Sequence, residues 1–244
     1  MHQSLKAQAA LFAVTAGVLV AGCGGSNPRV IAAHKIADAL PDMIGPAKHY
    51  DVNVDGSAMS LARGHAHRVQ IHGRDVELAP SLVVNKLEVD AHDVSFDREA
   101  HKVENASHVD VNATIGQLHL DQYLAAHKPI AGLIVQIRWS DLEASVPVSA
   151  LGISTTVRVD GSLAPSASGA DKLDFVPSGG DIGPVPIPHR LIDMAMNRIN
   201  PVLDLSTMKF PVTISSTKAV NGVLVVEGTT TLGDKTEDDR RARP

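Results

Sequence analysis

Short runs in which apolar and polar residues alternate recur along this chain between residues 49 and 226. A period of two places every second side chain on the same face of a strand, so each run predicts a strand that is buried on one side. Turn-forming residues separate the runs, and Asn221-Gly222 is typical of a two-residue hairpin loop. The pattern therefore favours antiparallel sheets with one buried face. The clearest runs begin at His49, Val69, Leu87, Val109, Leu133, Leu151, Val212 and Val223.

Three other segments have apolar residues three or four positions apart, which is the spacing of a helix with one buried face. They are residues 29–44, where Pro41 is expected to kink or end the helix, residues 120–127 and residues 188–200. The expected fold class is α+β, with long antiparallel meanders and one or two helices laid against them.

The first 22 residues differ from the rest of the chain. An apolar run from Ala9 to Val20 follows a short start in which Lys6 is the only basic residue besides His2. The run is shorter than the roughly 20 residues that span a bilayer, and it is typical of an export signal. It ends in Val20-Ala21-Gly22-Cys23, which resembles the lipobox of bacterial lipoproteins. An ordinary secretory signal is the alternative interpretation.

Cys23 is the only cysteine in the sequence, so an exported protein could not use it for an internal disulfide. We therefore expect cleavage before Cys23 and attachment of acyl chains to its sulfur. The expected regions are a signal peptide (1–22), a lipid-anchored tether (23–28), one α+β domain (29–232) and a disordered polar tail (233–244). This organisation predicts a protein of the cell envelope, held on a membrane surface on the periplasmic or extracytoplasmic side.

Composition and motifs exclude several function classes. The formal net charge is −5 and aromatic residues make up 3% of the chain, so nucleic-acid binding through phosphate contacts or base stacking is not expected. The sequence has no nucleotide-binding, nucleophile-elbow or zinc-protease motif, and we predict no cofactor and no catalysis.

Two alternatives remain for the polar residues. His65 and His67 would share a strand face and could chelate a metal together with His72, but the twelve histidines are scattered and we expect no metal site. An enzyme acting on envelope lipids or glycans would require the fold to gather residues such as Asp93, Asp97 and His101 into one cleft.

Several phrases of the sequence resemble the LmeA-like family of phospholipid-binding proteins. They include residues 36–44 leading into 51–56, residues 115–124, and residues 199–205 followed by 210–214. The resemblance covers roughly residues 30 to 230. It implies a fold similar to the tubular lipid-binding (TULIP, BPI-like) superfamily, with a long curved sheet wrapped around a helix and an apolar groove between them.

The resemblance also implies a phospholipid or another acyl lipid as the ligand. Contact with the membrane surface through lipidated Cys23 is expected from the lipobox-like residues that precede it. The amphipathic patterns of residues 133–139 and 188–200 make these two segments the expected walls of the groove. Alternatively, the same side chains fill a closed core, and the protein is a scaffold whose sheet docks another, unknown envelope protein. The candidate lining residues are Leu133, Val135, Ile137, Trp139, Leu191, Ile192, Ala195 and Ile199.

Overall fold

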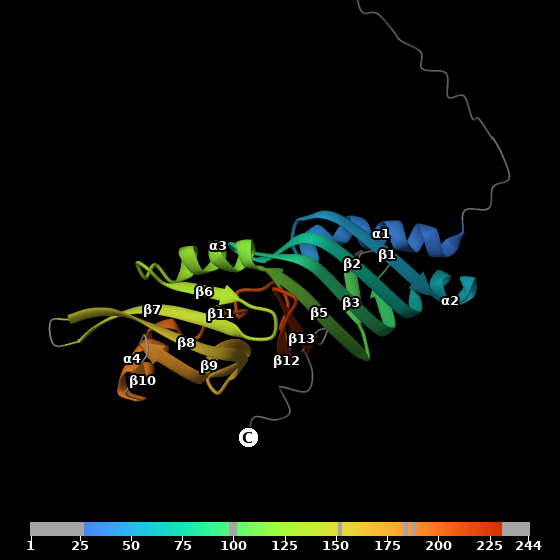
Figure 1. The fold of residues 1–244 in the computed structure, drawn as a ribbon. Helices are drawn as coiled ribbons and strands as arrows, with labels where there is room; N and C mark the ends of the chain where they lie inside the picture. The colour runs from blue at the N-terminus through green and yellow to red at the C-terminus, as the bar shows by residue number, and fades with distance from the viewer. Residues whose placement is uncertain (1–26, 98–101, 151–152, 183–184, 187–188, 231–244) are drawn as a thin grey trace, which may run out of the picture.

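Two antiparallel sheets follow one another along the length of the molecule (Figure 1). The structure is a computed structural model that describes residues 27–97, 102–150, 153–182, 185–186 and 189–230. In this part of the chain the first sheet has seven strands in the order β1-β2-β3-β5-β13-β12, and β4 pairs with β3. Its strands are β1 (Ala47–Asp55), β2 (His65–Ala79), β3 (Leu82–Asp97), β4 (Lys102–Asn105), β5 (His108–Gly116), β12 (Thr213–Val220) and β13 (Val223–Thr230).

The second sheet has six strands among the described residues, in the order β10-β9-β8-β7-β6, and β11 pairs with β9. The two sheets meet where β12 passes β8 and β9, and there the Thr217 hydroxyl donates a hydrogen bond to the Leu163 carbonyl. The strands are β6 (Ile134–Ile137), β7 (Leu142–Ala150), β8 (Ile153–Ser166), β9 (Gly169–Ile182), β10 (Val185–Pro186) and β11 (Leu203–Asp204).

Helices cover the sheets unequally. The longest one lies along the first sheet beside β1, a shorter one contacts β3, β5 and β6, and the last one packs against β7, β8 and β9 (Figure 1). The remaining helix is a single short segment beside the start of the longest helix. The helices are α1 (Pro28–Met43), α2 (Ala58–Ala62), α3 (Gln117–His127) and α4 (His189–Ile199).

The start of α1 is set by its first residues. The side chain of Asn27 accepts a hydrogen bond from the Arg29 amide at 3.1 Å, and Pro28 occupies the first turn, where its missing N–H costs nothing. The last two residues of the expected tether, 23–28, therefore belong to the helix and its cap. The helix continues past Pro41 to Met43.

The strands follow the alternation in the sequence. In β5 and β13 every second residue is buried, and the turn Asn221-Gly222 between β12 and β13 has positive φ at both positions, 53° and 79°, as the predicted hairpin requires. In β2 and β3 the buried face changes phase between Ala66 and Val69 and between Ala91 and Val94. The pairing of the two strands keeps one register across this change, so both strands change phase together.

The core is one continuous cluster of aliphatic side chains with few aromatic ones. The predicted α+β class is confirmed, and the first sheet is the strongly curved one (Figure 1). The largest fully buried side chains of the core include Leu40, Leu82, Leu87, Leu120, Leu142, Leu173, Phe175, Ile199, Leu203 and Leu224.

Candidate functional site

A cavity of about 320 Å³ lies between α1 and the face of the first sheet that the helix covers. Its walls come from α1, α2, β2, β3, β4 and β5, and Phe210 and Thr230 contribute from the C-terminal part of the chain. Pockets that hold small ligands in proteins span about 300–1,000 Å³, so this cavity is at the small end of that range.

The chemistry of the cavity is almost uniformly apolar. Of its 22 lining residues, all but Lys35 and Thr230 are apolar, and the Thr230 hydroxyl donates its hydrogen bond to the Pro211 carbonyl outside the cavity. Among the described lining residues, Lys35 is thus the only one with an ionisable side chain. The cavity suits a hydrocarbon ligand.

The inward face of α1 is only partly buried. Leu40 is fully buried, whereas Ala32, Ile36 and Ala39 reach only intermediate burial although they face the sheet. A hydrocarbon ligand in this space would bury the apolar surface that these residues leave uncovered.

The cavity opens at one end. Its exposed lining residues lie on the first two turns of α1 and on α2, whereas the residues around Leu40 and Ile44 at the other end are buried. A chain-shaped ligand would therefore enter beside α2 and extend along the helix. The exposed lining residues are Pro28, Ile31, Lys35, Ala58 and Ala62.

Polar contacts hold α1 at both ends and leave its middle free of them. At the C-terminal end, Lys209 Nζ donates to the carbonyls of Pro41 and Asp42 at 3.0 and 3.1 Å. At the N-terminal end, Arg29 Nε donates to the Gly56 carbonyl at 3.0 Å, and its guanidinium lies 3.9 Å from Asp55. Lys209 thus satisfies carbonyls that the end of a helix leaves unpaired.

Tyr50 closes the inner end of this region. Burial raises the pKa of Tyr50 to about 12, so its hydroxyl stays neutral and donates to the Gly45 carbonyl at 2.8 Å, just after α1. Its ring lies over Gly73 on β2, where a Cβ atom would approach Val76 Cγ2 to 2.5 Å.

The predicted groove residues lie elsewhere. None of the eight lines the cavity under α1. On the strand side, Val135 and Ile137 are buried and Leu133 is half-buried, but β6 ends at Ile137 and Trp139 is 75% exposed.

On the helix side, Ala195 and Ile199 are buried and Ile192 is half-buried, while the side chain of Leu191 lies outside the described part. The main contacts of α4 are with β7, β8 and β9, and those of β6 are with β7 and α3. The two segments share β7 as a neighbour, and a lipid between them stays a prediction. Cys23 lies outside the described residues.

A second hollow in the described part of the molecule is lined by α3, by the loop before β6 and by the start of β6. Leu133 and Val135 contribute to it together with Leu124 and Ile130, and the side chains of Asp121 and Lys128 make it more polar than the cavity under α1. It is therefore the poorer match for an acyl chain.

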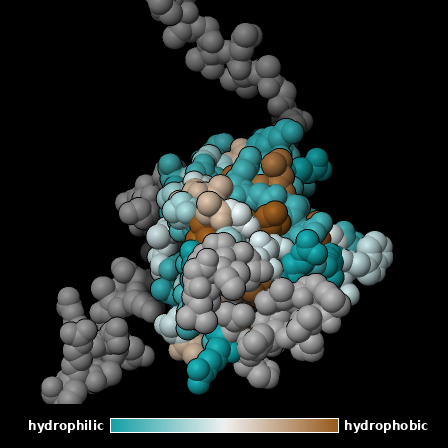
Figure 2. All heavy atoms as spheres, turned by 60° about the vertical axis from the view of Figure 1, so that its left-hand side comes forward, coloured by the Kyte–Doolittle hydropathy of each residue, from teal (hydrophilic) through white to brown (hydrophobic). Residues whose placement is uncertain are grey.

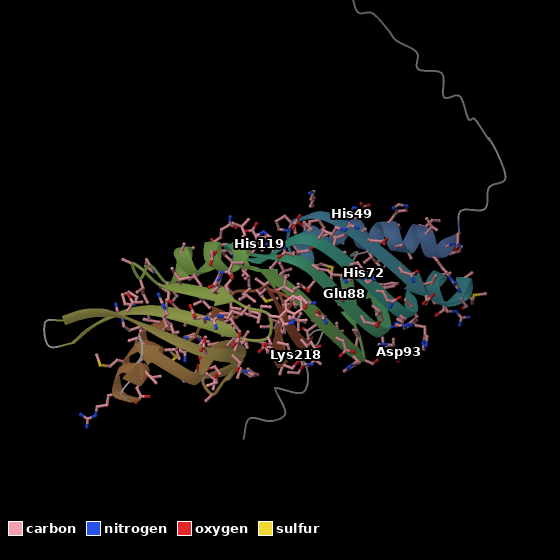
Figure 3. The ribbon with its side chains drawn as sticks, viewed as in Figure 1. His49, His72, Glu88, Asp93, His119 and Lys218 are labelled. Carbon is pink, nitrogen blue, oxygen red and sulfur yellow. The ribbon has the colours of Figure 1, made fainter. Side chains whose placement is uncertain are left out.

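The histidines do not converge on one point. Figure 3 shows His49, His72 and His119 spread along the molecule. His67 lies 3.3 Å from Asp93 and His72 lies 3.6 Å from Glu88, each on exposed strand positions. Among the described residues no three metal-binding side chains gather into a group. Asp93 also accepts a hydrogen bond from Ser107 at 3.2 Å, while the side chains of Asp97 and His101 lie outside the described part.

Small residues in the sequence indicate the cavity. The face of α1 toward the sheet carries Ala32 and Ala39, and one of the strand residues beneath the helix is Ala91. Small side chains on both sides of a helix–sheet contact leave space unless the backbones approach closely. The helix itself was predicted, but this space was not.

A family model described as LmeA-like phospholipid-binding matches residues 29–229, from the first turn of α1 to the end of β13. The chain belongs to this family. No curated protein and no solved structure gives a significant match. Among the described residues, no helix combines the length and apolar character needed to cross a membrane.

Proposed function

We propose that the protein binds a phospholipid by holding an acyl chain in the cavity between α1 and the first sheet. The family match supports phospholipid as the ligand class. The observation that carries the proposal is the apolar lining of this cavity, in which Lys35 is the one ionisable side chain that the described part of the chain contributes.

Hydrocarbon transfer sets the requirement that such a site must meet. Each methylene gains about 0.8 kcal/mol on leaving water, so ten buried methylenes correspond to roughly 8 kcal/mol. The methylenes of a lipid are already buried away from water in a bilayer. A protein can therefore extract the lipid only if its cavity is nearly as apolar as the interior of the bilayer. The walls of Val, Ile, Leu and Ala under α1 satisfy this condition.

We further propose that the protein acts as a lipoprotein of the cell envelope that carries or presents phospholipid without catalysis. The lipobox-like residues before Cys23 support the anchor, and the described cavity walls contain no carboxylate, imidazole or thiol.

Two matched substitutions test the site. Ile36→Glu places a carboxylate on the half-buried face of α1 toward the cavity, and Ile192→Glu places one at a half-buried position of α4, in the groove that the sequence predicted. A buried carboxylate without a partner is strongly disfavoured in an apolar site, so each change should repel an acyl chain only where one binds.

Native mass spectrometry and lipid extraction of the purified proteins give the readout. We expect co-purified phospholipid in the wild type and in Ile192→Glu, and its loss from Ile36→Glu with the circular dichroism spectrum unchanged. Loss from Ile192→Glu alone would move the site to α4, and retention by both variants would place it elsewhere. A wild type that is empty from several expression hosts would refute lipid binding.

The scaffold alternative has one observation in its favour. Trp139 and Val220 are exposed to 75% and 42%, and they lie close together because the Asn221 amide donates to the Trp139 carbonyl at 3.0 Å. Figure 2 shows further hydrophobic residues scattered among hydrophilic ones on the face at the end of the second sheet. A protein captured by the wild type and not by Trp139→Ser would support a docking role for these residues.

A further inference from the structure

Three large apolar side chains are exposed at the end of the molecule where the cavity opens. Val30 and Ile31 in the first turn of α1 are 50% and 45% exposed, and Met59 on α2 is 64% exposed. We call these residues the tip patch. The two helices contact each other, and the hydrogen bond from Arg29 Nε to the Gly56 carbonyl ties the start of α1 to the segment that enters α2.

The tip patch is continuous with the cavity. Ile31 belongs to both, and Pro28, Ala58 and Ala62 of the same two helices are exposed lining residues of the cavity. An acyl chain that leaves the cavity at its open end must therefore pass beside the tip patch.

The length of chain before α1 identifies what faces this end. Only four residues separate Cys23 from Pro28, and the five steps of an extended chain at up to about 3.6 Å each span roughly 18 Å in total. If Cys23 carries acyl chains in a bilayer, the first turn of α1 cannot move further than this from the membrane surface.

The charges at this end suit the same surface. Arg29, Lys35 and Arg63 are exposed around the apolar side chains. Apolar residues flanked by cations are the composition of a protein surface that lies in the interface of a membrane with anionic lipids.

We propose that the tip patch docks on the phospholipid bilayer, so that the cavity opens directly onto the membrane. The inference rests on the proposed anchor at Cys23 and on the proposed cavity. Docking lets an acyl chain pass between bilayer and cavity without crossing water, which would expose its methylenes.

A labelling experiment tests the orientation. The chain from Gly24 to Pro244 contains every described helix and strand and has no cysteine, so a substituted cysteine is its only thiol. An N-terminal histidine tag holds it on vesicles of phosphatidylcholine and phosphatidylglycerol that contain a nickel-chelating lipid, in place of the acyl anchor. An environment-sensitive fluorophore is attached at Met59→Cys or, as the matched control, at Leu118→Cys on α3, which is 66% exposed.

We expect the label at residue 59 to shift to shorter wavelength and to be quenched by nitroxide-bearing lipids, while the label at residue 118 keeps its spectrum in solution. Equal behaviour of the two labels, or quenching at residue 118 alone, overturns the proposal. If a protein covers the tip patch instead, the label at residue 59 stays in water on these vesicles, and the proposal is also wrong. The tag replaces acylation, and cavity occupancy is measured separately by mass spectrometry, so failure of either proposed function is distinguished from failure of docking.

Discussion

Substitution of Ala91 by leucine separates a cavity from a packed core. Ala91 is 3% exposed on β3 and lines the cavity, whereas Ala113 on the neighbouring strand β5 is 6% exposed and does not line it. The same change at both positions alters strand propensity and unfolded-state hydrophobicity equally. The difference between the two variants therefore reports the space around each side chain.

The magnitude follows from the added atoms. Leucine brings three more carbons than alanine, which gain up to roughly 2 kcal/mol when buried in unoccupied space, less about 0.5–1 kcal/mol for fixing the rotamer. Ala91→Leu should therefore raise the free energy of unfolding of lipid-free protein by about 1 kcal/mol. In a filled site the same insertion costs about 1–3 kcal/mol, which is the expected loss for Ala113→Leu.

Urea unfolding of delipidated protein, followed by circular dichroism, measures both values. Ala91→Leu should also reduce the amount of co-purified lipid, because its side chain takes up part of the space of an acyl chain. If both variants lose stability by similar amounts, the space under α1 is filled and the reasoning about the cavity is wrong.

Three further changes test other parts of the structure. Cys23→Ser should abolish metabolic labelling with a palmitate analogue, because the acyl transfer needs the thiol; labelling that persists would refute the anchor. Gly161→Ala places a Cβ atom 2.3 Å from the Val176 carbonyl oxygen and 2.6 Å from Phe175 Cε1, and we expect a loss of about 1–3 kcal/mol in urea unfolding, whereas an unchanged midpoint would contradict this packing. The hydrogen bond from Arg68 lowers the pKa of Asp90 in the folded state. The contribution of this pair to stability is therefore complete above the pKa of an unfolded aspartate, about 4, and is lost as the pH falls through the lower pKa of the folded state. Asp90→Asn should flatten the fall in stability between about pH 4 and pH 2, and an acid-unfolding curve equal to that of the wild type would assign no role to this pair.

Local patterns predicted the elements of this fold well, because each element carries its own periodicity. The strand beginning near His49, the helix over residues 29–44 and the Asn221-Gly222 turn were all confirmed. The confirmed family match covers nearly the whole of the described chain.

The position of the cavity could not be predicted in the same way. Periodicity shows which face of a segment is buried, but not which second element covers it or whether the covering is complete. Ile192 and Val135 have the right pattern for a groove wall, yet neither lines the cavity under α1. Ile36 has the same pattern and does face a cavity, because small residues opposite it leave the space unfilled.

If the cavity under α1 binds an acyl chain as proposed, the partly buried face of this helix couples folding to lipid binding. A lipid that binds only the folded chain stabilises it by RT ln(1 + [L]/Kd), about 2.7 kcal/mol when the free ligand is a hundredfold above its dissociation constant. The half-buried Ile36 and Ala39 would then become part of a complete core only in the loaded state. In a cell envelope the empty protein would be the less stable form, and proteases that act on unfolded chains would remove unloaded copies first.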